Sequence, residues 1–162
     1  MARRVLRPKG EGKPIGMYSA GLDVDAGRLI FVAGQVAMDA EGRLVGEGDV
    51  AAQAGQVYRN LEAILKEAGC GWRDVVKFTT FLTRHEDFGP FGEWRKREYA
   101  RLFPDGVFPP NTGVVVQALA RPGMLLEVEA IAVKPPAARP AAKPAKPAKA
   151  AKRPASRARR RR

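Results

Sequence analysis

One boundary in the sequence decides where a hydrophobic core can form. From Pro135 onward the chain has no aromatic residue and no aliphatic side chain larger than alanine. Such a segment cannot bury enough apolar surface to offset the entropy lost on folding, so we expect it to be disordered. The residues before it are numerous enough to bury a core. The sequence therefore predicts one folded domain followed by a tail.

The positive charge follows the same boundary. The chain has 29 Lys and Arg against 17 Asp and Glu, a net charge of +12. Residues 134–162 contain 12 of the basic residues and no acidic one, so residues 1–133 are balanced in charge. We therefore divide the chain into a basic flexible leader at 1–14, a folded domain at 15–133 and a disordered basic tail at 134–162.

Composition also limits where the protein acts. The leader lacks the apolar segment of a signal peptide, and no apolar run reaches the roughly 20 residues that span a bilayer. A single cysteine, Cys70, excludes an intramolecular disulfide. One histidine and one cysteine are too few for a typical metal site. We expect a cytoplasmic protein without metal or cofactor and without a membrane partner. In a bacterium, the tail would bring this protein near the nucleoid.

The apolar periodicity predicts an α+β fold. Alternation with β-branched and aromatic residues indicates strands, and apolar spacings of three and four indicate helices. In chain order we expect strands at 18–22 and 28–33, a helix between the cap Asp49 and Gly69, a strand at 75–82, a helix at 88–103, and strands at 112–119 and 124–133. The order is ββαβαββ. Each helix has one apolar stripe, which favours both helices on one face of a mixed sheet.

Local signals predict how these elements connect. The Asp25-Ala26-Gly27 turn suggests that the first two strands pair with each other. Gly34 interrupts the second strand and indicates a bulge or a close backbone approach. We expect the strands on either side of the first helix to pair in parallel through a right-handed crossover.

Five segments together carry a resemblance to a known family. They are IGMYS at 15–19, FVAGQ at 31–35, AAQ at 51–53 with Asn60-Leu61, DVVK at 74–77 with FLT at 81–83, and LEVEAIA at 126–132. In this order and spacing, from about Ile15 to Val133, the chain resembles the RidA/YjgF family of enamine/imine deaminases. The resemblance implies a chorismate-mutase-like fold and a homotrimer with small-molecule clefts between subunits.

The resemblance also implies a reaction. In typical members an arginine holds the substrate carboxylate, and a glutamate positions a water that attacks an imine, giving a 2-keto acid and ammonia. A guanidinium matches a planar carboxylate, and one well-placed carboxyl can carry the protons. By this resemblance Glu127 and Tyr18 are the catalytic candidates. Gly34, whose backbone lines the cleft, and Thr112 are substrate-binding candidates.

Two positions depart from the family pattern. Asn111 stands where the family has its carboxylate-binding arginine, and Gly92 stands where it has an asparagine in the second helix. An amide lacks the charge of a guanidinium, and losing a hydrogen bond to a charged group costs about 1.5–3 kcal/mol. We therefore expect an altered substrate or lost deaminase activity, with Asn111 as a substrate-binding residue that suits a neutral ligand.

Each candidate also has a structural interpretation. Glu127 is equally interpretable as a solvated strand carboxylate, Tyr18 as cleft lining only, and Asn111 as a strand-entry residue. His85 and Cys70 would form a catalytic pair only if the fold happened to bring them together. Ribonuclease activity, sometimes attributed to this family, ranks low because the sequence offers no histidine pair.

The tail predicts non-specific nucleic-acid binding. Lysines in a Lys-Pro-Ala register and a terminal arginine run neutralise phosphates without reading bases. The residues we expect to bind are Lys143, Lys146, Lys149, Lys152, Arg153, Arg157, Arg159, Arg160, Arg161 and Arg162. The alternative is an active 2-imino acid deaminase whose tail serves only solubility or localisation.

Overall fold

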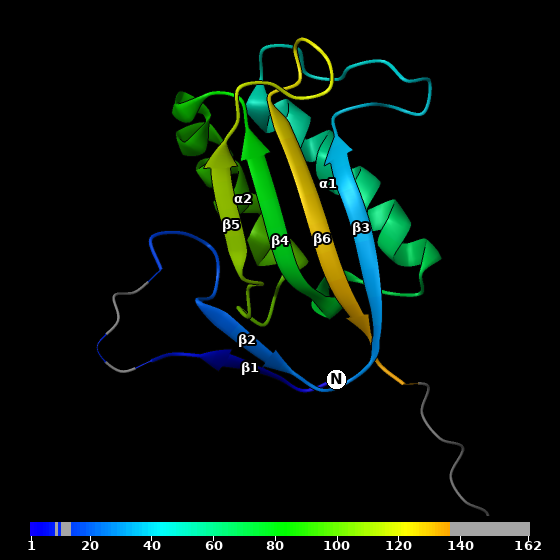
Figure 1. Cartoon of the computed structure of the whole chain (residues 1–162), viewed down its shortest axis with the longest axis vertical. Coiled ribbons are helices and arrows are strands. Elements are labelled where there is room, and N and C mark those ends of the chain that lie inside the picture. The colour runs from blue at the N-terminus through cyan, green and yellow to red at the C-terminus, as the bar shows by residue number, and fades with distance from the viewer. Residues whose placement is uncertain (9, 11–13, 137–162) are drawn as a thin grey trace, which may run out of the picture.

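A four-stranded mixed sheet with two helices on one face forms the body of the protein (Figure 1). The computed structural model describes residues 1–8, 10 and 14–136. The strands are β3 (Arg28–Val36), β4 (Val75–Leu82), β5 (Asn111–Val115) and β6 (Leu126–Lys134), and the helices are α1 (Val50–Glu67) and α2 (Phe88–Leu102). Short 3-10 helices, η1 (Trp72–Asp74) and η2 (His85–Asp87), precede β4 and α2. The predicted α+β class and the one-sided helix layer are confirmed.

The strand order corrects one prediction. The order is β3-β6-β4-β5, so β6 separates the two strands that flank α1. β6 pairs antiparallel with β3 and β4, and the directly paired parallel strands are β4 and β5. The reason lies in the apolar side chains of β6, since Leu126, Val128, Ala130 and Ala132 are all at most 2% exposed. A strand that apolar is best buried at the centre of the sheet.

The N-terminal residues correct a second prediction. Strand β1 (Arg3–Leu6) lies inside the segment that we expected to be a flexible leader, and it pairs with β2 (Gly21–Val24) in a separate two-stranded sheet. The expected pairing of strands at 18–22 and 28–33 is therefore wrong. The Asp25 side chain accepts a hydrogen bond from the Ala2 amide at 2.7 Å, so it closes the β1–β2 pair instead of turning a hairpin toward β3.

The helix boundaries follow the predicted caps. The Asp49 side chain accepts from the Ala51 and Ala52 amides at 2.9 and 3.1 Å, as an N-cap does. Gly69 adopts a φ of +68° just after α1, a conformation that favours glycine. The predicted last two strands start or end differently, because β5 ends at Val115 and β6 begins at Leu126.

The two faces of the sheet differ in exposure. α1 and α2 cover one face and bury the core there. On the other face, which we call the open face, Leu29 and Phe31 of β3 are 54% and 72% exposed. Val114 and Val115 at the end of β5 are 38% and 45% exposed. Within the described residues, no helix combines the length and the apolar character needed to cross a membrane.

Candidate functional site

The structure brings Gly34 and Glu127 together at one end of the sheet. The β3–β6 register shifts between Val32 and Gln35, which confirms the bulge predicted at Gly34. A Cβ added at Gly34 would collide with the Glu127 carboxylate and would lie 2.6 Å from its Cδ atom. The absence of a side chain at Gly34 therefore allows the Glu127 side chain to lie across the β3 backbone.

Burial changes the acidity of Glu127. The half-buried carboxylate loses hydration, which raises its pKa above the ordinary value, and the negative charge of Glu129 on the same strand raises it further. A carboxyl group with a raised pKa can hold and release a proton nearer to neutral pH than an exposed glutamate can. This geometry fits an acid–base role.

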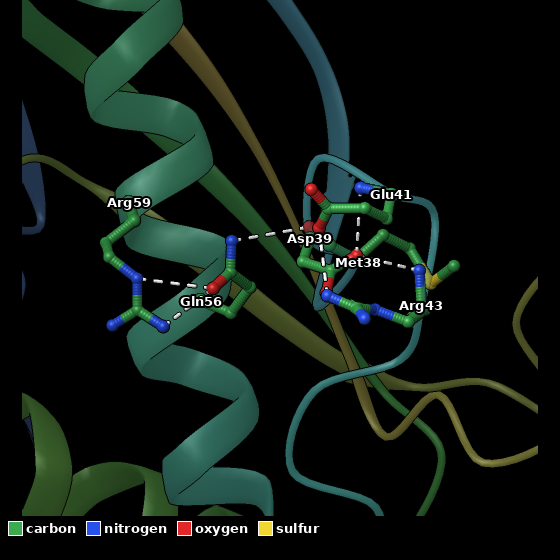
Figure 2. Close-up of polar contacts among 6 residues, drawn as sticks. All are labelled: Met38, Asp39, Glu41, Arg43, Gln56 and Arg59. Atoms are coloured by element: carbon green, nitrogen blue, oxygen red, sulfur yellow. Dashed lines mark hydrogen bonds and ion pairs between the residues drawn. The ribbon is translucent and has the colours of Figure 1, made fainter.

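The loop after β3 is folded tightly beside this end of the sheet (Figure 2). Asp39 accepts hydrogen bonds from the Arg43 amide at 2.9 Å and from the Arg43 Nε at 2.9 Å, and the pKa of Asp39 is lowered chiefly by that backbone bond. Gln56 of α1 donates to the Met38 carbonyl at 3.3 Å. These contacts fix the loop against α1.

The second catalytic candidate, Tyr18, lies in a different place. It lines a cavity of about 530 Å³ between the β1–β2 pair and the segment before β5. Ser19 and Phe108 also line this cavity. Figure 1 shows the β1–β2 pair beyond the lower end of the sheet, whereas β6 begins at the upper end. Tyr18 shares its cavity with Gly106 and Phe108, which precede β5, whereas Glu127 is the second residue of β6 and does not line this cavity.

Asn111 lies at the start of β5 and turns toward the helix layer. Its Oδ1 accepts a hydrogen bond from the Thr80 hydroxyl at 3.0 Å, and Thr80 is 1% exposed. This bond uses one of the two lone pairs of the carbonyl oxygen, so the Asn111 side chain keeps both donor and acceptor capacity.

Asn111 and Glu127 are too far apart to share a ligand within one chain. Asn111 of β5 pairs with Phe78 of β4, and Glu127 of β6 pairs with Phe81 of β4. Asn111 and Glu127 are therefore two strands apart. Strand spacing and rise place their Cα atoms roughly 14 Å apart. The two side chains also lie on opposite faces, because Asn111 contacts buried Thr80 while Glu127 projects on the open face. Asn111 and Glu127 thus lie two strands and three residue positions apart, on opposite faces of the sheet.

Thr112 belongs to the open face and has an unpredicted partner. Lys77 of β4 donates to the Thr112 hydroxyl at 2.7 Å and to the Phe78 carbonyl at 2.6 Å. Burial lowers the pKa of Lys77, and the Glu129 charge partly offsets this effect. Lys77 was not among the predicted site residues, although its alternation with Thr79 and Phe81 places a basic residue on an otherwise uncharged strand face.

The remaining candidates do not form a reactive centre. His85 lies beside Phe88, with 5.7 Å between ring centroids, and Cys70 is buried at the end of α1. Burial raises the pKa of the Cys70 thiol, and the Asp74 charge adds to that shift. No group of three or more metal-ligating side chains occurs in the part of the chain that the structure describes. The predicted nucleic-acid-binding residues at 143–162 lie outside that part.

The fold and the Gly34–Glu127 contact define a two-layer α+β domain with a half-buried acidic group beside a backbone bulge. Sequence comparison gives the family. The chain belongs to the RidA/YjgF family, because the family model described as Endoribonuclease L-PSP matches residues 9–134. A rat protein named 2-iminobutanoate/2-iminopropanoate deaminase is 40% identical over 135 residues, covering 83% of this chain and 92% of that protein.

Solved structures agree with this assignment. The Rid-family protein YyfB of Yersinia pestis, of unknown function, is 35% identical and superposes with a TM-score of 0.72, covering 83% of this chain and all of that one. TdcF of E. coli, solved with bound serine, is 30% identical with a TM-score of 0.60, covering 81% of this chain and 98% of that one. The chain is therefore a family member related to imine deaminases.

Proposed function

We propose that the protein hydrolyses an imine or enamine in a cleft between copies of itself, with Glu127 as the acid–base group and with substrate recognition altered at Asn111. The observation that carries the proposal is the half-buried Glu127 carboxyl held against Gly34. Relatives named as 2-iminobutanoate/2-iminopropanoate deaminases support the reaction class.

The chemistry needs one carboxyl group and one water. Ionised Glu127 takes a proton from the water as its oxygen bonds to the imine carbon. The same carboxyl donates that proton to the imine nitrogen, which gives a carbinolamine with an NH₂ group. Glu127 then takes the proton of the carbinolamine hydroxyl and passes it to this NH₂ group, so the carbon–nitrogen bond breaks as the carbonyl forms and ammonia leaves. A raised pKa serves both halves of this cycle, because the group must gain and lose a proton in each turnover.

A second copy is required because one chain separates the two groups of candidate residues. The open face carries exposed Phe31, Leu29 and Val114, and monomeric proteins rarely leave large apolar patches uncovered. Packing of this face in a homotrimer would bring the Asn111 end of one copy toward the Glu127 end of another. Light scattering should give three times the 17.6 kDa chain mass. A monomer at micromolar concentration contradicts this assembly.

Recognition at the Asn111 position is expected to be weaker than in a deaminase with arginine. A neutral donor replaces a charge-assisted bidentate contact, which changes binding of an acidic imine by about tenfold to a hundredfold. Asn111 can still donate to an oxygen of the ligand through its NH₂ group.

Ammonia release tests the reaction. Imines of 2-keto acids and of uncharged carbonyl compounds are supplied, and release is compared with the uncatalysed rate. Wild type should accelerate at least one class, and Glu127→Gln should abolish the acceleration. The matched control is Glu67→Gln, an exposed glutamate near the end of α1, which should keep the rate. Unchanged release in Glu127→Gln, or no acceleration of any imine, refutes the proposal.

We also propose that residues 134–162 bind nucleic acid without sequence preference. The observation that favours this second function is the charge segregation, with all the excess positive charge beyond residue 133. A polycation gains affinity for duplex DNA by releasing counterions, so binding weakens steeply as salt rises. Random duplex should bind the full chain, and a chain ending at Lys134 should bind poorly. Equal binding by the shortened chain rejects this function.

A further inference from the structure

A buried hydroxyl group of the core holds the side chain of Asn111. The Thr80 Oγ1 donates to the Asn111 Oδ1 at 3.0 Å, across the parallel β4–β5 pair. Thr80 is 1% exposed and lies between Phe78 and Leu82, which are also buried, on the helix-covered face of β4. Burying a hydroxyl at such a position costs free energy unless it is hydrogen-bonded. The Asn111 amide supplies this bond.

The bond to Thr80 determines how the Asn111 amide is turned. Because Oδ1 points to the Thr80 hydroxyl, the NH₂ group on the other side of the Cγ atom is turned away from β4. β5 is the last strand in the order β3-β6-β4-β5, and within the described residues no strand pairs with its outer edge. Asn111 is half-buried there. Its NH₂ group and one lone pair of Oδ1 therefore remain available to a ligand.

An aromatic ring lies beside this part of β5. Gly113 follows two residues after Asn111 and lies on the same face, because side chains alternate along a strand. A Cβ at Gly113 would lie 3.2 Å from the Cε1 atom of Phe88, so the Phe88 ring packs directly against the strand. Phe88 is 36% exposed, which leaves part of the ring available to an apolar group of a ligand.

The one basic side chain of β4 does not add its charge to this face. Lys77 donates to the Phe78 carbonyl and to the hydroxyl of Thr112, which belongs to the open face. A carboxylate beside Asn111 would therefore lose hydration without compensation from the Lys77 cation. A primary amide has a donor and an acceptor side by side, and these match the acceptor and donor that Asn111 presents.

We infer that Thr80 is a positioning residue that holds the Asn111 amide in the orientation that selects a neutral, amide-bearing ligand over the corresponding acid. The inference rests on the proposed function, because it takes Asn111 to be a residue that recognises the ligand of the cleft. Thr80 touches no ligand and acts only through its hydrogen bond. Without this bond the amide rotates about its Cβ–Cγ bond, so its donor and its acceptor no longer meet the ligand together.

Binding of a matched amide and acid to the full chain tests the inference. Calorimetry compares 2-oxobutanamide with 2-oxobutanoate, and wild type should bind the amide about twofold to tenfold more tightly, as expected for one further hydrogen bond. Thr80→Val keeps the shape but lacks the hydroxyl, so it should lose this preference, whereas Thr80→Ser should retain it. Thr79→Val, on the same strand but on the opposite face, is the control and should keep the wild-type preference.

Two further readouts separate positioning from a change in the fold. The side-chain amide signals of Asn111 in nuclear magnetic resonance spectra should shift on amide binding in wild type and Thr80→Ser, but not in Thr80→Val. For an imine that the protein hydrolyses, Thr80→Val should raise KM at constant kcat, because an interaction equally strong with substrate and transition state affects KM alone. A loss of folding would instead lower kcat and weaken binding of both ligands.

The same measurements can overturn the inference. An equal or stronger affinity of wild type for the acid does so, as does an amide preference that Thr80→Val leaves unchanged. A loss in Thr80→Ser as large as that in Thr80→Val also overturns it, since the hydroxyl group would then not be what orients Asn111.

The test also distinguishes this inference from the proposed reaction. An amide preference that depends on Thr80, together with ammonia release that Glu127→Gln leaves unchanged, supports the positioning role and refutes hydrolysis by Glu127. Ammonia release that depends on Glu127, together with an amide preference that Thr80→Val leaves unchanged, supports the hydrolysis and overturns the role of Thr80.

Discussion

At the scale of single residues, the candidate site depends on one missing side chain. Gly34 has a φ outside the left-handed region, so its conformation does not require glycine. What requires glycine is the approach of the Glu127 side chain, which occupies the space of a Cβ. The bulge in β3 and the acidity of Glu127 are therefore linked through contact, not through backbone strain.

Gly34→Ala should reduce activity without unfolding the protein. The added methyl group would displace the Glu127 carboxyl, and we expect kcat/KM for imine hydrolysis to fall at least about tenfold, which corresponds to roughly 1.4 kcal/mol. Steady-state ammonia release measures this fall. Gly89→Ala in α2, where a Cβ meets nothing within 4 Å, is the control and should keep the wild-type rate.

The raised pKa of Glu127 predicts a pH-dependent stability difference. A carboxyl group whose pKa is higher in the folded state favours folding when it is protonated, and this contribution is lost as pH rises through the folded pKa. Replacing Glu127 by Gln removes the cost of ionisation. Glu127→Gln should therefore gain stability relative to wild type as pH rises from about 4 to 7.

Urea unfolding of both proteins at a series of pH values, at one chain concentration, measures this difference. Glu67→Gln on the exposed surface of α1 is the reference and should show no such trend. A difference between Glu127→Gln and wild type that stays constant with pH contradicts the prediction.

At the scale of elements, polar side chains of α1 organise the loops at the Glu127 end of the sheet. Gln53 is fully buried, donates to the Gly46 and Gly123 carbonyls at 3.1 and 2.7 Å, and accepts from the Leu125 amide at 2.8 Å. Asn60 donates to the Val36 carbonyl at 3.1 Å. These two residues belong to the family-like motif of α1, and the structure gives them a supporting role rather than a chemical one.

Gln53→Leu should destabilise the fold strongly. It leaves the Leu125 amide and the Gly123 carbonyl without their partner, at a cost of about 1–3 kcal/mol each. Chemical denaturation measures the loss. Gln56→Leu, one turn along α1 and only half-buried, should cost less than about 1 kcal/mol. Similar losses in the two variants would show that the buried bonds of Gln53 contribute little.

At the scale of the whole molecule, we expect the open face to form the contact between copies of the chain. Phe31 is 72% exposed, more than any other large apolar residue of the open face. Lys77, Thr112 and Glu129 lie on the same face, so the face mixes polar and apolar groups, as interfaces between subunits do.

Phe31→Lys should dissociate the assembly. A charge buried at a subunit interface without a partner costs several kcal/mol, so light scattering should report a single chain with native circular dichroism. Ile64→Lys, a 37% exposed position on α1, should leave the assembly intact. Retention of the trimer in Phe31→Lys contradicts a role for the open face.

Much of the fold could be predicted because its signals are local. The Asp49 cap, the Gly69 terminus, strand β4 and the Gly34 bulge each depend on residues within a few positions of each other. The central place of β6 and the pairing of β1 with β2 could not be predicted, because both depend on which surfaces compete for burial across the whole chain.

For the candidate site too, some features could be predicted from the sequence and others depend on the tertiary structure. The sequence alone determined that the chain carries a family-like glutamate, lacks the family arginine at Asn111 and concentrates its excess charge after residue 133. Only the tertiary structure decided that Asn111 and Glu127 lie two strands apart on opposite faces of the sheet, and that the Thr80 hydroxyl comes to lie beside the Asn111 amide. The sequence specifies the residue types, but the distances between side chains remote in sequence are set when strands and helices pack to bury their apolar faces.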